Sequence, residues 1–87
     1  MPIQIVSIEN ASRAIAAFHR RCIREGAVFQ QPAETDCYRD TDAGDTFIVL
    51  RNVRGVLAVY RERGIRRSLR YVEPSALPER MLHAIGC

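Results

Sequence analysis

The sequence contains no lysine, and all 13 of its basic residues are arginine. Every fixed positive charge is therefore a planar guanidinium fork that suits phosphate or carboxylate groups, and none is a flexible ammonium. Ten acidic residues reduce the net charge to +3. That value is too small to identify a nucleic-acid-binding protein, so the distribution of the arginines has to decide the question.

The sequence also lacks the motifs of several kinds of site. Its three cysteines, Cys22, Cys37 and Cys87, are widely spaced and form no CxxC pair, so we expect neither a disulfide framework nor a zinc site. No GxSxG, HExxH or P-loop motif occurs. His19 lies three residues before Cys22, but Cys22 falls on an apolar helical stripe, which predicts a buried structural cysteine. We therefore expect no catalytic residue, no metal and no cofactor.

Long apolar runs are absent as well. None approaches the roughly 18 residues that a membrane span needs, and the N-terminal MPIQIVSIEN has no basic lead of the kind that precedes a secretory signal. We expect a cytoplasmic protein with no membrane partner. Its 87 residues predict one small domain, residues 1–87.

The first half of the chain contains one strong helical pattern. Residues 3–8 alternate weakly and predict a short strand. Residues 11–25 predict a helix, because apolar residues recur at helical spacing at Ala11, Ala14, Ile15, Phe18 and Cys22. Gly26 lies where a helix-ending glycine belongs. Residues 27–29 predict a second short strand, and the polar, acidic residues 30–45 predict a loop.

The second half alternates apolar residues with arginines. Strands are predicted near 46–52, 56–62 and 65–72, joined by turns at NVRG (52–55) and RG (63–64). These turns would pair Asn52 with Val56, Leu50 with Ala58 and Tyr60 with Arg67. Ser75 would cap a final helix over residues 76–85. The order β-α-β-β-β-β-α predicts an α+β domain, with two helices and a mostly antiparallel sheet that ends in a three-stranded meander.

The strand period of two sorts the side chains of this meander onto two faces. The core face would carry Ile48, Leu50, Val56, Ala58, Tyr60, Ile65, Leu69 and Tyr71. The other face would carry Phe47, Val49, Leu57, Val59 and Val72, together with Arg51, Arg61, Arg66 and Arg70. We name Arg51, Arg61, Arg66, Arg70 and Phe47 the sheet arginine face; it is the candidate binding site.

Two interpretations of the sheet arginine face remain open. Arginine forks beside an aromatic ring suit single-stranded nucleic acid, which they bind by phosphate contacts and base stacking. Alternatively, a helix covers the apolar strip, and the arginine stems pack along its rim with their charged ends in water.

Four aspartates, Asp36, Asp40, Asp42 and Asp45, lie in the acidic segment 34–45. The motif DTDAGD is faintly similar to a calcium loop but lacks the EF-hand order. A solvated acidic loop is the simplest interpretation. In a third, the segment forms ion pairs with arginines of its own chain or of a neighbour.

The alternating pattern over residues 46–72 resembles the terminal antiparallel sheet of RelE/ParE-type toxins, some of which cut messenger RNA. Those toxins usually carry a helical pair before the sheet, whereas this sequence predicts one helix before residues 46–72. No residue match transfers a catalytic role. The resemblance implies an RNA-directed module, such as a ribonuclease toxin, as the alternative function.

The leading expectation is a small cytoplasmic, non-catalytic binding or interaction domain of unknown specific function, with RNA and an acidic protein as its candidate partners. A homodimer is also expected, because a small domain with an exposed strand edge invites pairing with another chain.

Overall fold

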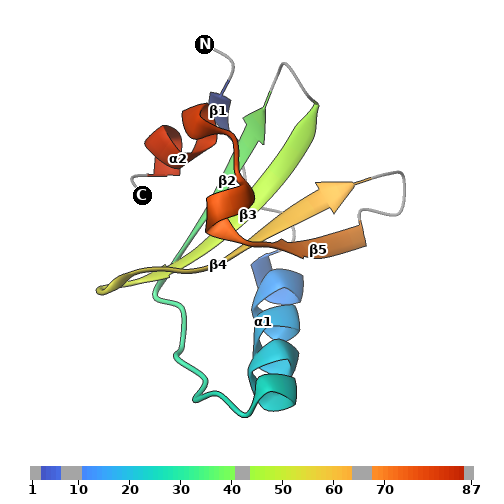
Figure 1. Ribbon diagram of the computed structural model, residues 1–87, viewed down its shortest axis with the longest axis vertical. Coiled ribbons are helices and arrows are strands. Elements are labelled where there is room, and N and C mark those ends of the chain that lie inside the picture. Colours follow the sequence, from blue (N-terminus) through green and yellow to red (C-terminus); the bar gives the residue numbers. More distant parts are fainter. Residues whose placement is uncertain (1–2, 7–10, 41–43, 64–67, 86–87) are drawn as a thin grey trace.

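The structure of the protein is a computed structural model of residues 1–87, in which residues 3–6, 11–40, 44–63 and 68–85 are described here (Figure 1). The elements are β1 (Ile3–Val6), α1 (Ala11–Glu25), β2 (Glu34–Asp40), β3 (Asp45–Asn52), β4 (Gly55–Arg63), β5 (Ser68–Val72), the 3-10 helix η1 (Pro74–Ala76) and α2 (Glu79–Ile85). The predicted α+β class and the order β-α-β-β-β-β-α are confirmed. No helix among these residues is long and apolar enough to cross a membrane.

The five described strands form one sheet in the order β1-β2-β3-β4-β5, and every neighbouring pair is antiparallel. Figure 1 shows α1 on one side of this sheet and α2 on the other. Two apolar clusters result. The α1 face buries Ala14, Phe18, Cys22, Cys37, Ile48, Leu50, Ala58 and Tyr60. The α2 face buries Tyr38, Phe47, Val49, Val59, Leu77, Met81 and Ile85.

Helix α1 has the predicted bounds, Ala11–Glu25. Its buried residues Ala14, Phe18 and Cys22 are spaced by four, so they form one stripe that packs on the sheet. Gly26 ends the helix with a φ of +67°, a left-handed conformation that glycine adopts without the steric cost of a Cβ.

The prediction for residues 27–45 was wrong in its central part. Residues 27–29 form no strand, whereas residues 34–40 of the predicted loop form β2, which pairs with both β1 and β3. The sequence ETDCYRD has few apolar residues, and its polar composition suggested a loop. It is stable as a strand because Cys37 and Tyr38 enter the two cores, and because Asp36 meets Arg51 of β3.

The turn between β3 and β4 differs from the prediction by one residue. Leu50 pairs with Ala58 as expected, but Asn52 pairs with Gly55 and Arg51 with Val56. Leu57 is thus an extra residue on β4, which makes a β-bulge. As a consequence Val56 packs on the α2 cluster and Leu57 on the α1 cluster, the reverse of the predicted faces.

The register of β4 and β5 was also wrong. Tyr60 pairs with Tyr71 rather than with Arg67, because the strands pair from Arg63 and Ser68 outward rather than from a tight turn at residues 63–64. The displacement is four residues, an even number, so the faces are unchanged. Leu69 and Tyr71 accordingly pack on the α1 cluster, and Val72 packs on the α2 cluster. Ile65, Arg66 and Arg67 lie outside the described residues.

The C-terminal segment is shorter as a helix than predicted. Ser75 belongs to η1 and caps no α-helix, and α2 begins at Glu79, where the Pro78 carbonyl accepts backbone hydrogen bonds from Met81 and Leu82. Proline suits this place because it has no N–H to leave unpaired. Leu77, Met81 and Ile85 are at most 6% exposed and form the cover of the α2 face.

Candidate functional site

Phe47 is the aromatic member of the sheet arginine face. Phe47 is 3% exposed and belongs to the cluster that includes Met81 and Ile85 of α2. Its ring is buried in the core and has no free face on which a base could stack. The apolar strip of the sheet arginine face is therefore covered by a helix, as the second interpretation stated.

Arg51 joins the sheet to the C-terminal helix. Its Nε donates to Asp36 Oδ2 at 2.7 Å, one terminal nitrogen donates to the Ile85 carbonyl at 2.6 Å, and the other donates to the Tyr38 hydroxyl at 3.0 Å. Burial disfavours the charged guanidinium, but the hydrogen bonds to Asp36 and Tyr38 outweigh this effect, so the pKa of Arg51 is raised. Each of the three guanidinium nitrogens thus donates to an acceptor of the same chain, and Arg51 ties β2 and α2 to β3.

The remaining members of the sheet arginine face differ among themselves. Arg61 is half-buried, and its Nε is buried with no hydrogen-bond partner in the described part of the chain. Arg70 lies directly opposite Arg61 in the β4–β5 register and is exposed. Arg66 lies outside the described residues. The structure thus keeps Arg61 and Arg70 together and separates them in role from Arg51.

The acidic segment supports the ion-pair interpretation. Besides the pair of Asp36 with Arg51, Asp45 Oδ1 accepts from Arg63 Nε at 3.1 Å. Asp42 lies outside the described residues. Both described ion pairs of this segment are made with arginines of the same chain, on strands that follow it in sequence.

A second set of arginines, absent from the predicted site, lies on the outer side of α1. We name Arg13, Arg20 and Arg24 the α1 outer stripe; all three are exposed. Their spacings of seven and four residues place them on one line along the helix. The spacing of these arginines in the sequence already indicates the stripe, once residues 11–25 are taken as a helix.

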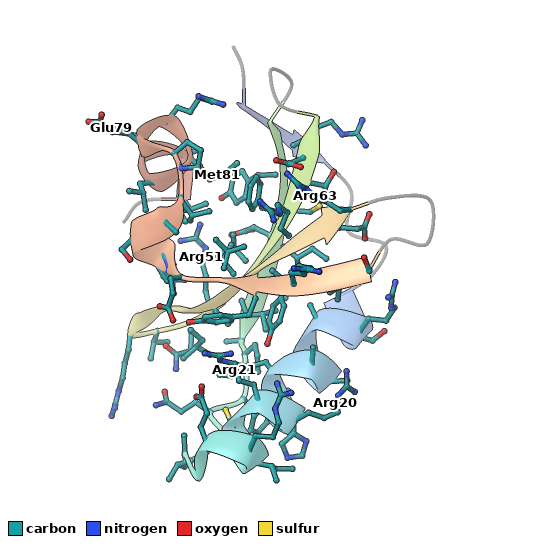
Figure 2. All side chains as sticks on the ribbon, turned by 45° about the vertical axis from the view of Figure 1, so that its right-hand side comes forward. Arg20, Arg21, Arg51, Arg63, Glu79 and Met81 are labelled. Atoms are coloured by element: carbon teal, nitrogen blue, oxygen red, sulfur yellow. The ribbon has the colours of Figure 1, made fainter. Side chains whose placement is uncertain are left out.

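Arg21 belongs to the inner side of the same helix. Figure 2 shows Arg21 directed toward the sheet and Arg20 away from it. The Arg21 guanidinium lies 3.6 Å from the centroid of the Tyr71 ring, a cation–π contact, and pairs with Glu25 at 2.9 Å. Desolvation, with a smaller contribution from the charge of Glu73, raises the pKa of Tyr71. A shallow hollow of about 420 Å³ opens here, with Phe18, Leu57 and Tyr71 among its lining residues.

The predicted structural role of Cys22 agrees with its burial. Cys22 is 5% exposed, whereas His19 is exposed and its ring lies 4.5 Å from that of Phe29. His19 therefore packs against an aromatic ring on the outside of the helix. Within the described residues, no group of three His, Cys, Asp or Glu side chains is arranged to hold a metal ion.

Comparisons with known proteins identify no relative that could suggest a role for these arginines. No protein-family model matches the chain. No curated protein matches its sequence, and no solved structure matches its fold.

Proposed function

We propose that this chain is a small non-catalytic interaction domain that binds an acidic segment of a partner protein through the α1 outer stripe. The observation that carries the proposal is the alignment of three exposed arginines, Arg13, Arg20 and Arg24, on one helix. At 1.5 Å per residue they span roughly 16 Å. Among the described residues none of the three forms an ion pair, so their forks are available to carboxylates.

The neighbouring surface favours a protein over a nucleic acid. Ile23 is 68% exposed and lies beside Arg20 and Arg24, and Val28, just beyond the helix, is 86% exposed. Exposed apolar side chains next to arginines are typical of protein interfaces, where an apolar anchor is surrounded by a charged rim. Single-stranded RNA would instead be bound by aromatic rings on which its bases can stack.

The experiment is a titration of the chain with two labelled peptides and one RNA. One peptide is an amphipathic helix of glutamate and leucine, the second is polyglutamate, and the RNA is a single-stranded 12-mer. We expect the glutamate–leucine peptide to bind more tightly than polyglutamate, because only the former offers an apolar partner to Ile23. Its affinity should fall as salt rises, because exposed charges are screened.

The matched variants are Arg20→Glu/Arg24→Glu on the helix and Arg39→Glu/Arg54→Glu elsewhere on the exposed surface. Both change the net charge equally, so only the position of the change differs. We expect the α1 variant to lose peptide binding and the control variant to keep it. Equal loss in both variants, or no peptide binding by the wild type, would reject the proposal. Tighter binding of the RNA, lost in the α1 variant, would replace it by the RNA-directed alternative.

We also propose that the chain forms a homodimer, which is tested separately from peptide binding. β5 is an edge strand of the described sheet and carries the exposed Arg70. A charged residue on an edge strand disfavours edge-to-edge pairing, so self-association would more reasonably use the apolar residues Ile23 and Val28. Light scattering under reducing conditions distinguishes pairing through β5 from pairing through Ile23 and Val28. A dimer that is lost in Ile23→Ser would use the apolar residues, and a dimer that is kept would use the strand edge.

A further inference from the structure

Of three arginines on the α2 face of the sheet, two form ion pairs with aspartates and one forms none with any described residue. Arg51 Nε donates to Asp36, and Arg63 Nε donates to Asp45. Arg61 lies on the same face, two residues before Arg63 on β4, and its Nε is buried without a partner in the described part of the chain. Two of these three guanidinium groups are therefore neutralised by a carboxylate of the chain itself, and the third is not.

The residue opposite Arg61 adds a second positive charge that has no carboxylate partner among the described residues. Arg61 and Arg70 are direct cross-strand partners, so their Cβ atoms are about 5 Å apart. Like charges directly opposite each other destabilise a sheet. On the other side Arg61 faces Phe47 of β3, which offers no counter-charge. Neither Arg61 nor Arg70 forms an ion pair with any described residue.

We propose that Arg61 and Arg70 form a binding site for a phosphate group on the α2 face, at the β4–β5 edge of the sheet. An oxyanion placed between the two forks would neutralise the opposed charges and supply acceptors for the N–H groups that have none. A carboxylate holds its two oxygens in one plane and fills one fork, whereas the oxygens of a phosphate group point in tetrahedral directions, so that two of them can meet different forks. Arg70 is exposed, so a ligand can approach from solvent.

This site is independent of the α1 outer stripe. α1 and α2 lie on opposite sides of the sheet (Figure 1), and Arg61 and Arg70 occupy the face that α2 partly covers. A phosphate bound here could belong to a phosphomonoester or to the backbone of a nucleic acid. The two sources share the same recognition chemistry, so the experiment has to separate them.

The first measurement is a thermal melt in sodium phosphate and in sodium chloride of equal ionic strength, followed by calorimetric titration with inorganic phosphate. We expect phosphate to raise the melting temperature of the wild type above its value in chloride, because a ligand of the folded state stabilises it. In Arg61→Gln and Arg70→Gln the affinity for phosphate should fall about tenfold or more, which is the effect of losing one charge-assisted interaction. Arg54→Gln, a change in the exposed β3–β4 turn, is the matched control.

A second readout separates binding from a structural role. In chloride, Arg70→Gln should melt at the same temperature as the wild type or higher, because it removes a like-charge opposition. A structural residue would instead lower the melting temperature in both salts. Equal phosphate affinity in wild type and Arg70→Gln, or no stabilisation of the wild type by phosphate, would overturn the proposal.

Two further ligands identify the source of the phosphate, a nucleoside monophosphate and a single-stranded RNA 12-mer with hydroxyl ends. Binding of the RNA that is lost in Arg61→Gln and Arg70→Gln, but kept in Arg20→Glu/Arg24→Glu, would assign the site to a nucleic-acid backbone. Binding of the monophosphate alone would assign it to a phosphomonoester. In neither case does the result depend on the acidic-peptide proposal for α1.

Discussion

Arg51 donates to Asp36 across the β2–β3 pair at 2.7 Å, and the same guanidinium reaches the last turn of α2 through the Ile85 carbonyl at 2.6 Å. One side chain thus connects a polar central strand, its neighbour and the helix that covers them. β2 contains few apolar residues, so this connection adds to the burial of Cys37 and Tyr38 in holding the strand in the sheet. α2 has only seven residues, too few to be stable alone, and it gains an anchor at its C-terminal end.

Arg51→Ala should lower the free energy of unfolding by about 2 to 3 kcal/mol, because it removes hydrogen bonds made by a charged donor and leaves the Asp36 and Tyr38 oxygens without it. The expected loss is no larger because the Arg51 and Asp36 side chains are 20% and 37% exposed, so solvent partly screens their charges. Urea unfolding monitored by circular dichroism measures the change.

The control for Arg51 is Arg51→Lys, which retains the charge but not the fork. It should recover only a minor part of the loss, since one ammonium cannot satisfy three acceptors in this fixed geometry. Full recovery by lysine would mean that charge alone, and not the shape of the group, is what Arg51 contributes.

Phe47→Ala should destabilise the protein by about 3 to 5 kcal/mol, which is typical for a large buried aromatic residue. The ring is 3% exposed beneath α2, so the variant leaves a cavity between the sheet and the helix. Chemical denaturation gives the value, and Val53→Ala, at a residue 99% exposed, is the control that should change little. A small loss at Phe47 together with weakened RNA binding would mean that the ring is accessible in solution.

Tyr60→Phe should leave the stability at neutral pH unchanged or increase it by about 1 kcal/mol. The Tyr60 hydroxyl is buried and has no hydrogen-bond partner among the described residues, and a buried polar group without a partner is unfavourable. Removing it takes away that cost while the ring keeps its edge-on contact with Tyr71, at a centroid distance of 5.8 Å. A loss of more than about 1 kcal/mol in urea unfolding would show that the hydroxyl has a partner.

The same hydroxyl predicts a loss of stability in alkaline solution. Burial raises the pKa of Tyr60 above its ordinary value of about 10. Above about pH 10 the Tyr60 hydroxyl loses its proton in the unfolded chain but keeps it in the folded chain. The free energy of unfolding therefore falls as the pH rises. Unfolding curves between about pH 9 and 11 should show this decline, and it should be shallower in Tyr60→Phe. Tyr71, whose pKa is also raised by burial, should account for part of the decline that remains.

Amide exchange tests the position of β2. Residues 37–40 pair with strands on both sides, so their amides should exchange slowly, in the same range as those of β3. Residues 28–31 belong to no strand or helix and should exchange much faster. Fast exchange throughout 34–40 would support the loop that the composition of this segment suggested.

The sequence by itself determined the elements whose pattern is local. Helix α1 could be predicted to the residue, because its apolar spacing and the glycine that ends it lie within one stretch of 16 residues, 11–26. The strands of the meander followed from their alternation in the same way. Of the predicted site residues, Arg61 and Arg70 remain together as a candidate site, because both lie on stretches past the β4 bulge, where the period of two assigns the faces correctly.

Tertiary structure decided everything that depends on partners distant in the sequence. β2 became a strand because Cys37 and Tyr38 enter the two cores and because Asp36 meets Arg51, 15 residues later. A local stretch of sequence contains neither kind of partner. The opposition of Arg61 and Arg70 depends on where β4 and β5 begin to pair, which the turn residues alone did not specify. Phe47 is closed to solvent by a helix that starts more than 30 residues after it. The register of two strands, and the helix that covers a sheet face, depend on which distant apolar surfaces pack together and exclude water. The alternation of residues along one strand does not specify that partner surface.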